Sequence, residues 1–177
     1  MWSPCLPARN GDVLTGSESL TLVYARDPLP EGNSVFLADP TPRSDDVPSW
    51  RSHAVREPAV QWRGPRPLAV LIPEPPSGQR WPYFDDQAEW ETVAREAATV
   101  ILFWIPRDLR TLPGYTTNVE FGLDVTTGRA VLGCPPDCPD PDKNRYLIWL
   151  AHRHGVAVTG TLPATVTAAL DLIARTA

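Results

Sequence analysis

The sequence predicts a doubly wound α/β fold, in which helices cover both faces of a parallel sheet of about five strands. Two observations predict it. Short apolar runs alternate along the chain with longer stretches in which apolar residues recur at helical spacing. The runs are apolar at nearly every position, as in strands that are buried on both faces of a parallel sheet. Because crossovers between parallel strands are right-handed, such a chain is expected to wind helices onto both faces.

The expected strands are compact apolar runs that end near proline, glycine or aspartate. In chain order they cover Leu20–Ala25, Ser34–Ala38, Leu68–Ile72, Val100–Ile105, Arg129–Gly133 and Val156–Val158, of which the first is only a short β-prone run. Prolines cluster between the periodic segments. Because proline removes a ladder hydrogen bond and stops a helix, we interpret these clusters as loops.

The expected helices begin at residues that cap or start a first turn. They cover 49–62, which Pro58 kinks or ends, 86–98 after Asp85 or Asp86, 118–127, 144–154 and the stretch that follows Thr161, with Pro163 in its first turn. A chain of 177 residues suits a single domain. We expect that domain to span 20–177, behind an aperiodic N-terminal tail at 1–19 that carries proline, glycine and serine.

Composition excludes several classes of function. The 16 basic residues are outnumbered by 21 acidic ones, for a net charge of −5, which argues against a nucleic-acid partner. No apolar run reaches the roughly 18 residues of a membrane span, and no signal peptide is evident, so we expect a soluble cytoplasmic protein. Cys134 and Cys138 have no second pair of cysteines or histidines nearby, so we expect neither a metal nor a cofactor. Glycine-rich dinucleotide and P-loop motifs are absent.

Ligands of doubly wound folds bind beyond the carboxyl ends of the strands, where the strand order reverses. Four segments at expected strand ends are rich in polar and aromatic residues: Asp39–Arg43, Tyr83–Glu91, Phe103–Arg107 and Gly114–Gly122. We therefore expect the functional site to be built from these segments.

Glu120 is the most informative residue, because it is expected in the first turn of a helix, where backbone N–H groups and the helix dipole favour an anion. A carboxylate kept charged at a strand-end crevice suits a nucleophile, although it could also simply stabilise its helix. Asp86 and Glu91 supply further carboxyl groups, and paired carboxyl groups cleave glycosidic bonds. Trp90 and Trp104 could stack on a flat base or pack in the core.

Five motifs in order carry a family resemblance. They read Ser-Val-Phe-Leu-Ala-Asp-Pro-Thr-Pro-Arg (34–43), Pro-Ser-Trp-Arg (48–51), Asp-Asp-Gln-Ala-Glu-Trp-Glu (85–91), Ile-Leu-Phe-Trp-Ile-Pro-Arg (101–107) and Thr-Thr-Asn-Val-Glu-Phe-Gly (116–122). Together they resemble the nucleoside 2-deoxyribosyltransferase-like family over about residues 20–175. The resemblance implies a flavodoxin-like sheet and cleavage of N-glycosidic bonds in nucleosides or nucleotides.

The resemblance also implies roles for particular residues. Glu120 would carry a covalent glycosyl intermediate, and Gln87 and Glu91 would lie near the sugar and base. The family assembles as dimers or larger, and Asn144 would be lent by a neighbouring subunit. With Glu120 and Glu91 as catalytic residues, the candidate substrate-binding residues are Asp39, Pro40, Thr41, Arg43, Asp86, Gln87, Trp90, Trp104, Arg107, Asn118 and Asn144.

One position departs from the family pattern. The first loop reads Ala38-Asp39-Pro40, where the family usually has Ala-Gly-Pro. A carboxylate there would repel a phosphate, although Arg43 and Arg107 could offset its charge. Two other readings stay open: a module that binds or senses a nucleotide without turnover, and a scaffold with a vestigial pocket.

Overall fold

The computed structural model describes residues 19–38, 40, 42, 47, 49–76 and 84–176. The expected N-terminal tail lies outside the described residues except for Ser19, and so do Asp39, Thr41 and Arg43. None of the helices in the described ranges is long and apolar enough to cross a bilayer.

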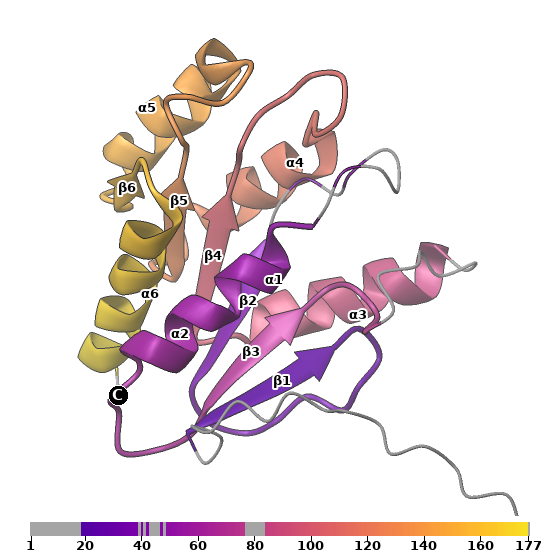
Figure 1. The fold of residues 1–177 in the computed structure, drawn as a ribbon, viewed down its shortest axis with the longest axis vertical. Helices are drawn as coiled ribbons and strands as arrows, with labels where there is room; N and C mark the ends of the chain where they lie inside the picture. The colour runs from indigo at the N-terminus through magenta and orange to yellow at the C-terminus, as the bar shows by residue number, and fades with distance from the viewer. Residues whose placement is uncertain are drawn as a thin grey trace, which may run out of the picture.

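All strands of the sheet run parallel, as the apolar runs predict (Figure 1). They are β1 (Leu20–Tyr24), β2 (Ser34–Ala38), β3 (Leu68–Ile72), β4 (Val100–Trp104), β5 (Ala130–Gly133) and β6 (Val158–Thr159), in the order β1-β3-β2-β4-β5-β6. The order from β3 to β6 is that of flavodoxin-like sheets, with β1 added at one edge. The expected count of about five strands is therefore wrong by one. Six strands form, because the β-prone run pairs with β3 along its whole length and the short last run pairs with β5.

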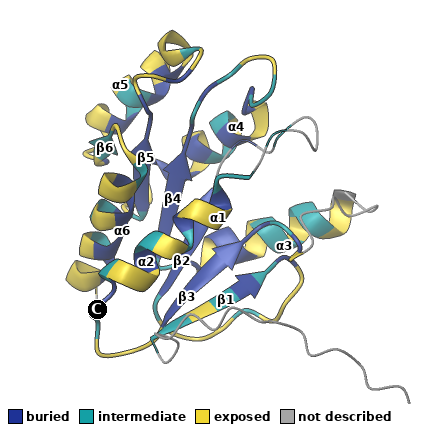
Figure 2. Ribbon diagram, in the orientation of Figure 1, coloured by how far each residue is buried: buried dark blue, intermediate teal, exposed yellow. Residues whose placement is uncertain are grey.

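Helices cover both faces of the sheet, as expected (Figure 1). One face is covered by α1 (Arg51–Ala54), α2 (Arg56–Gln61) and α6 (Leu162–Thr176), and the other by α3 (Phe84–Ala97), α4 (Tyr115–Asp124) and α5 (Arg145–Arg153), which follows the short 3₁₀ helix η1 (Pro141–Asn144). Successive side chains of β4 enter opposite cores: Phe103 packs under α4, and Leu102 packs under α6. Figure 2 shows the central strands buried and the outer faces of the helices exposed.

Two expected helices begin or break elsewhere. The stretch after Ser49 forms α1 and α2 with a break at Val55, so Pro58 lies inside the second helix and does not end it. The helix expected from Asn118 begins three residues earlier. Gly114 adopts a left-handed conformation (φ 63°) directly before α4, and its carbonyl accepts a hydrogen bond from the Asn118 N–H at 3.1 Å. Glu120 therefore lies beyond the first turn, and the expected helix-terminus effect does not apply to it.

The order of the strands fixes where a crevice opens. The chain passes from β2 to β3 on one side, and then crosses back through α3 to β4 on the other side of β2. The connections that leave the carboxyl ends of β2 and β4 therefore diverge, which is the switch point of a doubly wound sheet. The start of α1, the loop after β3, and helices α3 and α4 all border this point.

Candidate active site

Helix α3 presents one stripe of polar side chains to the site. Gln87, Glu91 and Arg95 are each four residues apart, so they share one face of the helix. The Gln87 amide Nε2 donates hydrogen bonds to Glu91 Oε1 at 2.7 Å and to the Pro73 carbonyl at 3.2 Å. The second bond ties the helix to the loop that follows β3. Gln87 thus fixes where the Glu91 carboxyl group lies.

Helix α4 presents a matching pair of carboxylates. Glu120 and Asp124 are four residues apart, and both face the guanidinium of Arg95 on α3. Arg95 Nη1 lies 3.2 Å from Glu120 Oε1, and Arg95 Nε lies 2.7 Å from Asp124 Oδ2. One planar cation therefore bridges the two carboxylates from a neighbouring helix.

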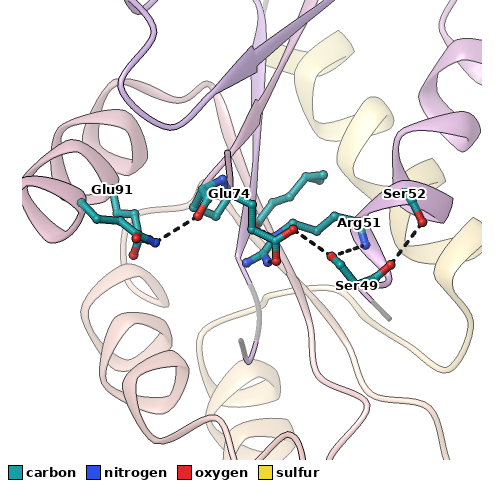
Figure 3. A network of polar contacts seen from close by, with 8 residues as sticks. Ser49, Arg51, Ser52, Glu74 and Glu91 are labelled. Carbon is teal, nitrogen blue, oxygen red and sulfur yellow. Dashed lines mark hydrogen bonds and ion pairs between the residues drawn. The ribbon is translucent and has the colours of Figure 1, made fainter. Parts of the chain in front are cut away.

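The third wall comes from α1 and the end of β3. Arg51 forms an ion pair with Glu74, and Ser49 Oγ donates a hydrogen bond to the other Glu74 oxygen at 2.9 Å. In the view of Figure 3, Glu74 lies between Glu91 on α3 and the residues at the start of α1. Arg51 Nε also donates to the Leu37 carbonyl at 3.4 Å, which ties α1 to the end of β2.

The electrostatics of the site couple its carboxyl groups. Burial raises the pKa of Glu120, and the charge of Glu91 raises it further, while Arg95 opposes both. Burial also raises the pKa of Glu91, against the Gln87 hydrogen bond and the charges of Arg51 and Arg95. Glu91 thus lies close enough to Glu120 to influence its ionisation, in surroundings where the charge of each group is only partly compensated.

Two expected substrate contacts are instead structural. Arg107 is 1% exposed, and its guanidinium donates hydrogen bonds to Asn144 Oδ1 at 2.9 Å, to Asn118 Oδ1 at 2.7 Å and to the Pro113 carbonyl. The expectation that Arg107 offsets the charge of a substrate phosphate is not supported, because these bonds hold it inside the chain. Asn144 is also buried, and its amide donates to the Ile105 carbonyl at 3.0 Å, so it does not reach out toward a neighbouring subunit.

Other predicted residues lie apart from the carboxylates. Asp86 is exposed and faces Arg26 at 3.8 Å. Trp90 is half-buried, and its indole Nε1 donates to the Asp27 carbonyl at 3.0 Å. Trp104 enters the core under α6 and contacts Trp50 with ring centroids 6.4 Å apart, so it lies on the opposite face from Glu120.

Pro40 borders the site in another way. It is buried against Gly114, where an added Cβ would lie 2.9 Å from the Pro40 ring and 2.8 Å from Arg107 Nη1. Only glycine fits this approach without a shift in its neighbours, and its left-handed φ reinforces that requirement. The loop before α4 is therefore closely fitted to the loop after β2.

Sequence reasoning missed four charged residues of the site: Arg51, Glu74, Arg95 and Asp124. Two of them carry a readable signal. Arg95 continues the four-residue spacing of Gln87 and Glu91, and Asp124 repeats that spacing after Glu120. Arg51 closes the Pro-Ser-Trp-Arg motif, and Glu74 stands two residues after a strand. Only the fold shows that these two pair. Within the described ranges, no three metal-binding side chains gather.

The charge of Glu91 on α3 acts on Glu120 on α4 beside the switch point of a flavodoxin-like sheet, and pairs of carboxyl groups can break glycosidic bonds. A family model described as nucleoside 2-deoxyribosyltransferase like matches residues 32–138. That range holds the charged residues of all three walls. A comparison with curated proteins finds no match. The model matches more than half of the chain, and the chain therefore belongs to the nucleoside 2-deoxyribosyltransferase-like family.

Proposed function

We propose that this protein breaks the N-glycosidic bond of a nucleoside or nucleotide by double displacement, with Glu120 as the nucleophile and Glu91 as the acid and base. Membership of the family suggests glycosyl transfer. The observation that carries the finer proposal is the pair of half-buried carboxyl groups on α3 and α4: the charge of Glu91 acts on Glu120, and Arg95 from the face of α3 that holds Glu91 pairs with Glu120 at 3.2 Å. Carboxyl pairs of this kind cleave glycosidic bonds through an oxocarbenium-like transition state.

In the first step an oxygen of Glu120 forms a bond to C1′ of the sugar while the bond from C1′ to the base nitrogen breaks. The electron pair of that bond leaves with the base, which takes a proton from Glu91. In the second step a nitrogen of another base, or a water oxygen, attacks C1′ and gives its proton to Glu91. The ester bond to Glu120 breaks, and the carboxylate is restored. Transferase and hydrolase share the first step and differ only in the second.

The surroundings of the two groups support this division of roles. Burial raises the pKa of Glu91, which favours the protonated form that a general acid needs. Burial raises the pKa of Glu120 as well, but Arg95, whose Nη1 lies 3.2 Å from Glu120 Oε1, opposes that rise and so favours the charged form that a nucleophile needs. Gln87 holds Glu91 by a hydrogen bond to one oxygen and leaves the other oxygen for the leaving base.

The test is Glu120→Gln, assayed by chromatography on a panel of deoxynucleosides and their monophosphates, with and without a second base. We expect the wild type to release or exchange the base. The variant should lose turnover by about 10³-fold or more, because an amide is a poor nucleophile. Glu89→Gln, an exposed carboxyl change on α3, is the matched control and should keep full activity. Wild-type turnover by Glu120→Gln would remove Glu120 from the mechanism. Binding without turnover by the wild type would favour a sensing module.

We also propose that the protein assembles as a homodimer or larger through α4 and α5. The exposed large apolar side chains Val119, Leu123, Tyr146 and Trp149 are each more than half exposed on these two helices, which contact each other. The exposed positions of α4 itself carry no charge. A second copy can therefore pack against α4 without burying like charges, while Arg145 and Arg153, which are exposed on α5, would lie at the rim, because charged groups are depleted from the cores of interfaces.

A further inference from the structure

Arg95 is a buried cation that serves two carboxylates at once. It is 7% exposed and comes from the last turn of α3, while both of its partners come from α4. Its Nη1 faces Glu120 and its Nε faces Asp124, so different nitrogens of one rigid guanidinium hold the two carboxylates. Asp124 is 6% exposed. Because all three groups are largely removed from solvent, salt and water screen their charges only weakly.

The charged groups that act on Glu120 come from three elements. Arg95 and Glu91 face it from α3, Asp124 from its own helix, and Arg51 from α1. Of these, Arg95 is in direct contact, at 3.2 Å. Asp124 competes for the same cation at a shorter distance, 2.7 Å. The two carboxylates therefore share the charge of Arg95, while Arg51 also acts on Glu120 and Arg129 also acts on Asp124.

We propose that Arg95 and Asp124 together set how strongly the nucleophile is held in its charged form. Arg95 positions Glu120 and keeps it charged, and Asp124, which pairs with the same cation, weakens that effect. The inference rests on the proposed role of Glu120. A nucleophile paired alone with an arginine would be held charged too firmly to attack well. Without the arginine, the pKa of the nucleophile would rise further, and the protonated form, which cannot attack, would be favoured. Because the cation is shared, the pKa of Glu120 lies between these two extremes. Arg95 and Asp124 are thus positioning residues, which act through Glu120 and do not touch substrate.

The pairing makes two predictions of opposite sign. Removing the cation by Arg95→Met should raise the pKa of Glu120, because the cation that pairs directly with it and favours its charged form is lost. Removing the competitor by Asp124→Asn should lower the pKa of Glu120, because a like charge is lost and the cation then serves Glu120 alone. If Arg95 and Asp124 only supported the fold, replacing them would not shift the pKa of Glu120 in opposite directions.

The experiment titrates Glu120 directly, by carbon-13 NMR of glutamate labelled at the carboxyl carbon, with the Glu120 signal assigned from its absence in Glu120→Gln. We expect the midpoint to rise by about one pH unit or more in Arg95→Met and to fall in Asp124→Asn. If the methionine variant does not fold, Arg95→Gln tests the same effect: it keeps hydrogen-bond donors without the charge and should also raise the midpoint. Asp171→Asn, an exposed carboxyl change on α6, is the control and should leave the midpoint unchanged.

The pH profile of kcat/KM supplies an independent readout, since its acid limb reports the nucleophile of the free enzyme. That limb should move with the NMR midpoint in each variant. Midpoints that shift in the same direction in both variants, or in neither, overturn the tuning by Arg95 and Asp124. If the two variants shift the pKa of Glu120 in opposite directions but the wild type turns over no nucleoside, the shared pairing is supported and the proposed function fails. A failure of the pairing can therefore be told apart from a failure of the proposed function.

Discussion

At the scale of single residues, the site places ionisable groups where charge is costly. Glu91 and Glu120 are half-buried, and each sits among partners that only partly balance it. For Glu91 the largest effect is burial, which disfavours the charged form more than Gln87 and the two arginines favour it. A carboxyl group held in this way reduces the stability of the fold whenever it is ionised, which is the usual conflict between stability and activity at a catalytic site.

This conflict predicts a pH-dependent stabilisation by Glu91→Gln. Burial raises the pKa of Glu91 in the folded protein. Below the pKa of the unfolded chain, Glu91 is protonated in both states, and its ionisation costs the fold nothing. As pH rises through the pKa of the folded protein, the buried group ionises and the free energy of unfolding falls. We expect the variant to be more stable than the wild type at pH 8, since the glutamine oxygen still accepts the Gln87 hydrogen bond without the charge. The difference should shrink toward zero near pH 4.

Urea unfolding at several pH values measures the effect as a difference in the free energy of unfolding. Glu89→Gln removes an exposed carboxylate from the same helix and should show no such dependence. If Glu91→Gln is less stable than the wild type at pH 8 and equal to it at pH 4, then the carboxylate stabilises the fold and our reading of its surroundings is wrong.

At the scale of elements, the strands were easier to predict than the site. Continuous apolar runs identify strands that are buried on both faces, and the first five expected runs form strands of the sheet, whereas the last, expected at Val156–Val158, enters it only at Val158. Because such a run is apolar at every position, it does not show on which face of the sheet a given side chain lies. Trp104 ends such a run, and only the structure shows it in the core opposite Glu120. Pro113 and Gly114 do form the loop, but α4 begins directly after them at Tyr115 and not at Asn118, because the left-handed Gly114 starts the helix without a side-chain cap.

The partners of the site residues were harder still to predict, because their contacts join distant segments. Arg51 and Glu74 are separated by β3, and Arg95 and Glu120 by β4 and its following loop. No local pattern reports such a pair. Spacing within one helix does carry information, and the intervals of four residues in α3 and α4 would have indicated Arg95 and Asp124.

The loop between β4 and α4 yields the prediction at this scale. Arg107 joins the loop, the start of α4 and η1 by its bonds to Pro113, Asn118 and Asn144, and burial lowers its pKa. Arg107→Met should therefore lower the free energy of unfolding by about 3 kcal/mol, since two buried acceptors and one partly buried acceptor lose their donor.

Arg107→Lys should not restore the loss of stability in urea unfolding, because a single ammonium cannot span acceptors that the guanidinium fork reaches. Arg110→Met is the control from the same loop. Its side chain is 90% exposed and its nearest carboxylate, on Asp108, is 3.9 Å away, so the change should stay within about 0.5 kcal/mol. If Arg107→Met lowered the free energy of unfolding by no more than Arg110→Met does, the loop would hold its position without the cation.

At the scale of the whole molecule, the two faces of the sheet end in different surfaces. Over α4 and α5 the apolar side chains gather, and Tyr146 stacks on Trp149 with ring centroids 5.6 Å apart. Over α2, on the opposite face, Val60 is a single exposed apolar side chain of comparable exposure, 67%. Isolated apolar residues are normal on a protein surface, whereas a gathered set marks a place of contact. The asymmetry therefore favours assembly through one face only.

The final prediction follows from this asymmetry. The four aliphatic and aromatic side chains over α4 and α5 offer on the order of 400 Å² of apolar surface, about half of the roughly 800 Å² that each partner contributes to a standard interface. Trp149→Lys and Leu123→Lys should each convert a dimer into a monomer in sedimentation velocity at micromolar concentration, because a desolvated ammonium at the centre of an interface has no partner there. Val60→Lys places the same charge on the opposite face and should leave the dimer intact. A wild type that sediments as a monomer, or variants that all stay dimeric, would show that this face is not the interface.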